Sequence, residues 1–119
     1  MLIVEDEYII ADVLQDILRR NTFVVCGLAE PVDEALQLVE KVQPELVLLD
    51  IYLKGKKTGI DLAKILTGIN IPFIYISANS NQQVLEAAKK TNPYGFIVKP
   101  FREKDVLVAI DIALYRHDN

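Results

Sequence analysis

The chain has 119 residues, and its 51% hydrophobic and 25% charged residues are typical of one globular domain rather than a disordered chain. A net charge of −4 argues against direct nucleic-acid binding, which needs many basic contacts to phosphates. One histidine and one cysteine argue against a Ser-His-Asp or Cys-His hydrolase and exclude an internal disulfide. We therefore expect a reducing, cytoplasmic location, without a signal peptide or a membrane span.

Apolar runs alternate with stretches of helical periodicity along the whole chain, and glycines and prolines fall near the boundaries. In chain order this pattern predicts a strand at 2–4, a helix at 7–20, a strand at 23–28, a helix from Pro31 to Pro44, a strand at 46–49, a helix at 60–66, a strand at 73–76, a helix at 82–91, a strand at 95–98 and a helix at 103–116.

Five strand–helix units with short connections predict right-handed crossovers, and hence a parallel sheet with helices on both faces. The expected fold class is α/β, a doubly wound (βα)5 flavodoxin-like sandwich with a five-stranded parallel sheet in the order 2-1-3-4-5. The most continuous apolar run, at 46–49, is typical of a strand covered on both faces. We expect residues 1–119 to form one complete domain, with no room for an effector domain.

Polar side chains follow the ends of four of these strands. Glu5 and Asp6 follow the first strand, Asp50 the third, Ser77 the fourth and Lys99 the fifth. In open α/β sheets, ligands bind outside the carboxyl ends of the strands, where the strand order reverses. In the expected order the reversal lies between the first and third strands, so these side chains are predicted to share one pocket.

Three carboxylates in one pocket repel one another, and a hard divalent cation would let all of them stay ionised. Oxygen ligands suit Mg²⁺, or alternatively Mn²⁺. Lys99 adds a positive charge and Ser77 a hydroxyl, so the pocket suits a phosphoryl group that arrives with a metal. A carboxylate can accept that group as an aspartyl phosphate. Each residue alone has a plainer interpretation, such as a helix cap or a solvated charge, but their joint placement at four strand ends favours the functional one.

The sequence resembles the receiver domain of two-component response regulators over its whole length. Four motifs carry the resemblance: Leu2-Ile3-Val4-Glu5-Asp6-Glu7, Leu46-Val47-Leu48-Leu49-Asp50, Tyr75-Ile76-Ser77-Ala78 and Phe96-Ile97-Val98-Lys99-Pro100-Phe101. The resemblance implies that Asp50 accepts a phosphoryl group from the phosphohistidine of a sensor histidine kinase or phosphotransfer protein. It also implies a regulatory domain that catalyses only its own phosphorylation and slow dephosphorylation.

The resemblance implies a Mg²⁺ site around Asp50. Asp6 and Asp50 would bind the ion directly, Glu5 would act through water, and the carbonyl of Tyr52 would complete the protein ligands.

The resemblance also implies a switch. Lys99 would pair with the phosphoryl group, Ser77 would move to bond it, and Phe96 would turn inward to fill the vacated space. The Lys99–Pro100 peptide bond would be cis. The switched surface would comprise the fourth helix, the fifth strand and the last helix, and a homodimer through this surface stays open.

Three features depart from the usual family pattern. The loop after Asp50 lacks the frequent Met-Pro and is one residue longer before Gly59. Tyr52 is bulky, and we hypothesise that it shields the acyl phosphate from water. Phe96 has no hydroxyl, so a tyrosine-specific hydrogen bond on the output face is lost, and plain core packing is its alternative role.

Three other functions fit the sequence less well. A haloacid-dehalogenase-type phosphatase would need a second aspartate where the chain has Tyr52. A flavodoxin-like FMN carrier would need a glycine- and hydroxyl-rich phosphate loop, whereas Glu5, Asp6 and Glu7 would repel phosphate. The intact acidic, hydroxyl and lysine set argues against a degenerate receiver that binds partners without phosphorylation.

Overall fold

The structure is a computed structural model that describes residues 1–25, 27–29, 32–52, 58–78 and 82–118. Predictions about Cys26, Pro31, the loop at 53–57 and the helix caps at 79–81 lie outside these residues. The elements are β1 (Leu2–Val4), α1 (Tyr8–Arg20), β2 (Gly27–Ala29), α2 (Val32–Val42), β3 (Val47–Asp50), α3 (Gly59–Gly68), β4 (Phe73–Ser77), α4 (Gln82–Lys89), β5 (Gly95–Val98) and α5 (Glu103–Asp118).

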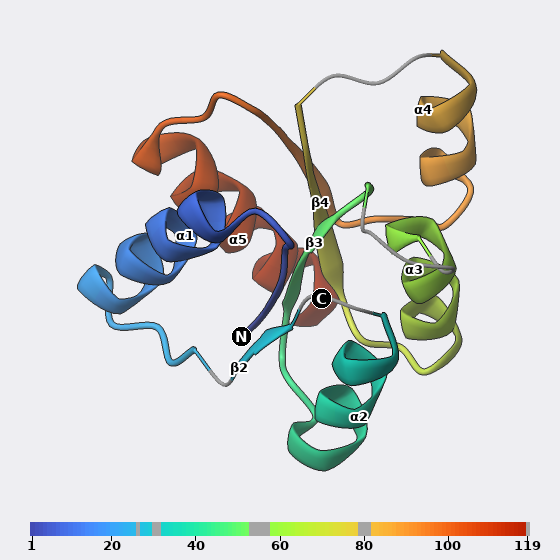
Figure 1. Ribbon diagram of the computed structural model, residues 1–119, viewed down its shortest axis with the longest axis horizontal. Coiled ribbons are helices and arrows are strands. Elements are labelled where there is room, and N and C mark those ends of the chain that lie inside the picture. Colours follow the sequence, from blue (N-terminus) through green and yellow to red (C-terminus); the bar gives the residue numbers. More distant parts are fainter. Residues whose placement is uncertain (26, 30–31, 53–57, 79–81, 119) are drawn as a thin grey trace.

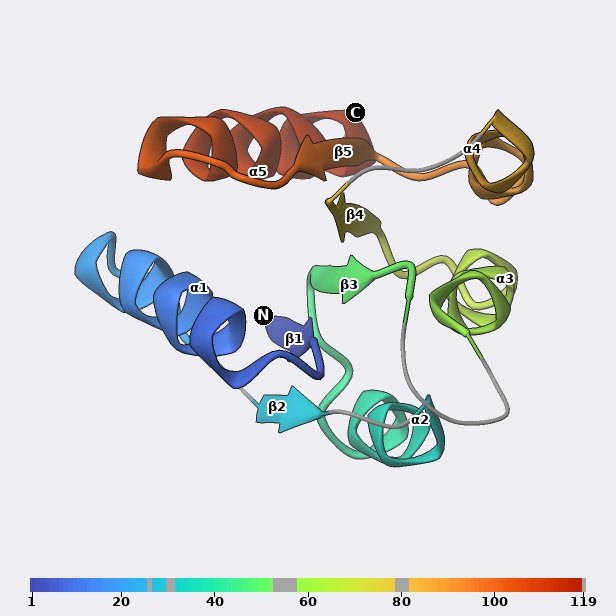
Figure 2. The same cartoon turned by 45° about the horizontal axis from the view of Figure 1, so that its top comes forward.

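The five strands form one parallel sheet in the order β2-β1-β3-β4-β5, which confirms the predicted fold class. Helices α1 and α5 cover one face of the sheet, and α2, α3 and α4 cover the other (Figures 1 and 2). This arrangement follows from the sequence, because every strand-to-strand connection contains a helix. The strand order reverses between β1 and β3, where the polar residues were expected to meet.

Each face of the sheet carries its own apolar core. Odd-numbered residues of β3 and β4, such as Leu49 and Tyr75, pack toward α2, α3 and α4, whereas Leu48 and Ile74 pack toward α1 and α5. The alternation follows from the two-residue period of a strand. All residues of β1, β3 and β4 are buried, as expected for strands that are covered on both faces.

The predicted second strand began too early. The observed β2 starts at Gly27 rather than residue 23, because Gly27 pairs with Leu2, the first residue of β1. The segment 23–25 therefore lies before the paired region, and the carbonyl of Val24 accepts a hydrogen bond from the N-terminal amine at 2.7 Å.

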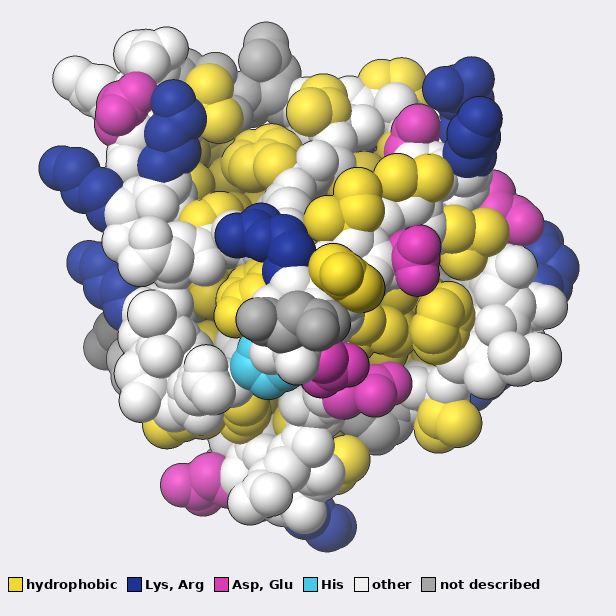
Figure 3. Space-filling model, turned by 180° about the vertical axis from the view of Figure 1, so that it is seen from behind, with side chains coloured by type: hydrophobic (Ala, Val, Ile, Leu, Met, Phe, Trp, Pro, Cys, Tyr) yellow, Lys and Arg dark blue, Asp and Glu magenta, His cyan; other side chains and the backbone are white. Residues whose placement is uncertain are grey.

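The surface mixes apolar patches with charged side chains (Figure 3). Exposed large apolar side chains on β5 and α5 are Val98, Val108, Ile112 and Tyr115. Within the described part of the chain, no helix has the length and apolar character needed to cross a membrane.

Candidate functional site

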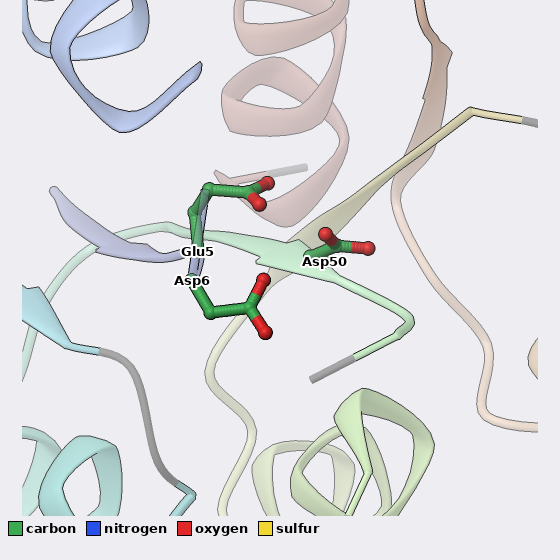
Figure 4. A group of neighbouring side chains, drawn as sticks. All are labelled: Glu5, Asp6 and Asp50. Carbon is green, nitrogen blue, oxygen red and sulfur yellow. The ribbon is translucent and has the colours of Figure 1, made fainter. Parts of the chain in front are cut away.

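Three carboxylates meet at the carboxyl edge of the sheet. Glu5 and Asp6 follow β1, Asp50 ends β3, and a carboxylate oxygen of each lies within 4.8 Å of the others. Glu5 and Asp6 direct their side chains toward the side on which Asp50 lies (Figure 4). Glu5 and Asp50 are each only 4% exposed, so water screens their repulsion poorly.

Lys99 brings the positive charge into this cluster. Its ammonium lies 3.3 Å from Glu5 Oε2 and 3.3 Å from Asp50 Oδ2, and its side chain is 11% exposed. Burial by itself would lower the pKa of Lys99, but the carboxylates of Asp50 and Glu5 outweigh burial and raise the pKa above its ordinary value. Lys99 is therefore held as a cation beside Asp50.

A fourth carboxylate reaches the same ammonium. Glu7 Oε2 lies 3.7 Å from Lys99 Nζ, on a side chain that is largely exposed at the start of α1. Glu7 was not among the residues predicted to form the site, although its position directly after Glu5 and Asp6 was a usable signal.

Backbone N–H groups hold two of the buried carboxylates in place. The N–H of Tyr52 donates to Asp50 Oδ1 at 3.0 Å, and the N–H of Glu7 donates to Glu5 Oε1 at 3.1 Å. Burial raises the pKa of Glu5 to about 7, and the nearby Asp50 carboxyl adds to the rise, whereas the Glu7 N–H and Lys99 oppose it.

The donor set fits a hard divalent cation. Glu5 Oε2 is buried, and beyond its ion pair with Lys99 Nζ at 3.3 Å it makes no hydrogen bond to the described residues. Three convergent carboxylates, with the Tyr52 backbone beside Asp50, supply the oxygen ligands that Mg²⁺ prefers. Glu5, Asp6 and Asp50 are thus the residues that could hold a metal.

Ser77 and Lys99 are joined through their backbones at the ends of β4 and β5, where the N–H of Lys99 donates to the carbonyl of Ser77 at 2.8 Å. Ser77 Oγ is buried and has no hydrogen-bond partner among the described residues, so it is not linked to Asp50 in this state. Phe96 is half-buried against Tyr75, with ring centroids 5.9 Å apart. The Lys99–Pro100 peptide bond is cis.

Helix α3 begins directly against the backbone of Asp50. A Cβ atom at Gly59 would lie 2.0 Å from the Asp50 carbonyl oxygen, so only glycine allows this approach. Thr58 caps the helix through a reciprocal hydrogen-bond pair with Asp61. The sequence analysis treated Gly59 only as the end of a loop and missed this close approach.

Known proteins share this fold and this arrangement of the sequence. A family model for the response regulator receiver domain matches residues 1–111. The chain belongs to this family. Receiver domains are regulatory rather than catalytic parts of two-component systems, and they interact with histidine kinases and output domains. They generally use Mg²⁺, which agrees with the acidic cluster.

The relatives include the transcriptional regulatory protein PdtaR of Mycobacterium tuberculosis, which is 32% identical over 117 residues, or 98% of this chain and 57% of PdtaR. The DNA-binding response regulator MtrA of Mycobacterium leprae is 28% identical over 120 residues, or 100% of this chain and 52% of MtrA. This receiver chain thus spans about half the length of the curated relatives it matches.

Two solved receiver domains resemble the structure closely. The signal receiver domain of a modulated diguanylate cyclase from Desulfovibrio desulfuricans G20 superposes with a TM-score of 0.93 at 30% identity, covering 98% of this chain and 94% of that one. The receiver domain of NtrX from Brucella abortus gives 0.88 at 30% identity, covering 96% and 97%.

Proposed function

We propose that residues 1–119 form one receiver domain in which Asp50 accepts a phosphoryl group from a phosphohistidine. A carboxylate oxygen of Asp50 attacks the phosphorus, the P–N bond of the donor breaks, and the donor imidazole leaves with the electron pair and takes up a proton. The partner would be a sensor histidine kinase or a phosphotransfer protein, and the product would be an aspartyl phosphate.

One observation carries this proposal: Asp50 is a buried carboxylate that lies 3.3 Å from the ammonium of Lys99, whose side chain is 11% exposed, and within 4.8 Å of two further carboxylates. This arrangement leaves the cluster with more acids than bases. A divalent cation would offset two of the excess negative charges, and it would lower the electrostatic cost of bringing in a phosphoryl group. A merely structural ion pair between Lys99 and Asp50 would not need the carboxylates of Asp6 and Glu5 beside it.

We assign the metal to Asp6 and Asp50, with Glu5 acting through water and Tyr52 through its carbonyl. Mg²⁺ is the preferred ion and Mn²⁺ the alternative, and when bound either one would stabilise charge on the phosphoryl oxygens. Lys99 would bind the same oxygens from the opposite side, because its ammonium already lies beside Asp50 Oδ2.

The unpaired hydroxyl of Ser77 supports a switch. A buried hydroxyl without a partner is costly, and a phosphoryl oxygen on Asp50 would give Ser77 the acceptor that it lacks. Phe96, half-buried next to Tyr75, would then turn into the space that Ser77 leaves. The two arrangements would form a two-state equilibrium that phosphorylation shifts.

The changed surface would be α4, β5 and α5, which would act on an output domain or partner. The exposed apolar residues of β5 and α5 could be buried in a contact with a partner or in a homodimer. Direct nucleic-acid binding by this domain is not part of the proposal, because the net charge is −4. The single cysteine agrees with a cytoplasmic location.

The test is incubation with a small phosphodonor and Mg²⁺, followed by intact mass measurement. The wild-type protein should gain the mass of one phosphoryl group, and hydroxylamine should remove it, as expected for an acyl phosphate. A chelator should prevent the gain. Asp50→Asn should abolish it, whereas Asp12→Asn on α1 should retain it.

Two results would contradict the proposal. If wild-type protein gains no phosphoryl group, the chain binds partners without phosphorylation. If it turns over phosphoesters continuously, it is a phosphatase.

A further inference from the structure

A second buried polar cluster lies between β4 and the C-terminal ends of α3 and α4. Tyr75 is fully buried, and its hydroxyl lies 2.6 Å from Thr91 Oγ1. Thr91 Oγ1 in turn bonds the carbonyl of Ala88 at 2.6 Å, and Thr67 Oγ1 bonds the carbonyl of Thr91 at 2.6 Å. We name Tyr75, Thr91, Ala88 and Thr67 the tyrosine cluster.

The hydrogen bonds of the tyrosine cluster have a fixed direction. A carbonyl oxygen can only accept, so Thr91 must donate its single hydroxyl hydrogen to Ala88. The hydroxyl of Tyr75 is therefore the donor to Thr91 Oγ1. These two hydrogen bonds link Tyr75 on β4, through Thr91, to the last turn of α4. The donor and the acceptor of each bond are fixed.

The ring of Tyr75 contacts the proposed switch residue. Tyr75 is paired in register with Phe96 on β5, and their ring centroids are 5.9 Å apart. Phe73 packs edge-on against the other side of the Tyr75 ring at 5.4 Å. Ser77 lies two residues after Tyr75 on β4, so both side chains leave the same face of the strand. Tyr75 therefore packs against Phe96 and lies on the same face of the sheet as Ser77.

Helix α4 is attached to the sheet mainly at its C-terminal end. Of its eight residues only Ala88 is buried, and Ala88 is the residue whose carbonyl accepts the bond from Thr91. Thr67 adds a link from α3 to the segment that follows α4. The first turn of α4 contributes no fully buried residue, although Val84 packs partly buried against the core, and this turn is the end nearer in sequence to Ser77.

We propose that Tyr75 is a positioning residue that anchors the C-terminal end of α4 through Thr91, so that phosphorylation moves α4 about this anchored end. The inference deepens the proposed function and rests on it for the motion, although the anchor itself exists without phosphorylation. The fixed Tyr75 ring would also limit how far Phe96 can turn. Movement would then be greatest at the first turn of α4 and smallest at Thr91.

Amide hydrogen exchange, followed by NMR on the whole chain, tests the anchor. The amides of Lys90, Thr91 and Asn92 donate to carbonyls in the last turn of α4, and they report on that end. Tyr75→Phe removes only the hydroxyl and should speed their exchange about tenfold, the effect of losing one buried hydrogen bond. The amides of β3, which exchange by global unfolding, measure the accompanying loss of global stability in the same variant.

Tyr94→Phe is the matched control. It removes a tyrosine hydroxyl that lies 3.2 Å from His117 Nδ1, away from the tyrosine cluster, and should leave the three amides unchanged. Thr91→Val is a second variant that keeps the side-chain shape but removes two hydrogen bonds, so it should speed exchange at least as much as Tyr75→Phe. Unchanged exchange in both cluster variants, or an equal change in Tyr94→Phe, would overturn the anchor.

Phosphodonor and Mg²⁺ then test the motion, with the phosphorylated fraction measured by intact mass on the same samples. In phosphorylated wild-type protein, exchange should change at Gln82–Leu85 and stay slow at Lys90–Asn92, whereas in Tyr75→Phe both segments should change. Equal changes at both segments in wild-type protein would overturn the inference. Absence of any mass gain would instead contradict the proposed function, and the exchange of unmodified protein would still decide on the anchor.

Discussion

The acidic site, formed by the carboxylates around Asp50 with Lys99 and Ser77, and the tyrosine cluster are both largely buried and polar. They differ in how many of their polar groups have hydrogen-bond partners. In the acidic site, three carboxylates share the single ammonium of Lys99, and Ser77 Oγ makes no hydrogen bond to the described residues. In the tyrosine cluster, every side-chain hydroxyl has a partner at 2.6 Å. Since unpaired buried groups are costly, a site that keeps them is organised for something that enters later.

Helix α3 connects the two regions, and a glycine lies at each end of it. The largest expected effect on stability comes from Gly59→Ala, because the added Cβ would lie 2.0 Å from the carbonyl oxygen of Asp50. We expect a loss of about 4 kcal/mol in the free energy of unfolding, since backbone atoms cannot move aside as a flexible side chain would. Urea denaturation measures this loss.

Gly68→Ala is the control at the other end of α3. Nothing lies within 4 Å of a Cβ at Gly68, so alanine should be neutral or should stabilise the helix by about 0.5 to 1 kcal/mol. Similar effects of the two substitutions would contradict the idea that the close contact with Asp50 makes Gly59 the more sensitive end of α3.

Lys99→Met should give the next largest effect. It leaves the buried carboxylates of Glu5 and Asp50 without their cation, and we expect a loss of about 3 kcal/mol in metal-free buffer. Mg²⁺ should restore part of this stability because it neutralises the same oxygens. Thermal unfolding with Mg²⁺ or with a chelator measures both effects, and Lys64→Met on α3 is the exposed control.

A wild-type response to Mg²⁺ in Lys99→Met and in Asp6→Asn would contradict the assignment of the metal to this cluster. The excess negative charge of the acidic site would then not be explained by a bound metal. The contrast with the tyrosine cluster would no longer indicate a binding site.

The acidic site was largely predictable and the tyrosine cluster was not. Glu5, Asp50 and Lys99 each follow an apolar run, and parallel strands bring the residues at their carboxyl ends together whatever the loops do. Thr91 contacts Tyr75 because α4 ends at Lys89, two residues before Thr91. That end depends on packing rather than on a local signal, and the helix was predicted to run to residue 91 but ends at Lys89.

Two further details of the acidic site also depended on three-dimensional packing. The reach of Glu7 to Lys99 depends on where α1 starts, and the contact of Gly59 with Asp50 depends on a loop whose path the sequence does not specify. The early start predicted for β2 has the same origin, because an apolar run becomes a strand only where a neighbouring strand is present to pair with it.

A rise in pH should test the tyrosine cluster without any ligand, when wild type is compared with Tyr75→Phe. Burial raises the pKa of Tyr75 to about 12, whereas a free tyrosine titrates near 10. The folded protein therefore favours the neutral phenol, and its stability is fully present below pH 10 and falls as the pH rises through about 12. Between these values the loss from Tyr75 should be about 2 kcal/mol.

Tyr75→Phe has no phenol to ionise at this position, so its free energy of unfolding should fall less steeply above pH 10. Urea denaturation at several pH values, with phenolate absorbance to follow ionisation, measures the difference. The same slope in wild type and variant would show that the tyrosine cluster does not control ionisation of this side chain.

Tyr52→Asn should have the smallest effect, and it concerns the lifetime of the phosphoryl group rather than stability. The Tyr52 side chain is 48% exposed, while its N–H bonds to Asp50 Oδ1, so the ring lies at the rim of the site and shields it only in part. Asparagine keeps the backbone hydrogen bond but admits more water to the acyl phosphate. We expect the phosphoryl half-life to shorten about threefold, equivalent to a lowering of the barrier by about 0.7 kcal/mol. Tyr115→Asn on α5 is the control and should leave the half-life unchanged. If the half-life is unchanged in Tyr52→Asn as well, the burial of Asp50, rather than the Tyr52 side chain, limits the access of water.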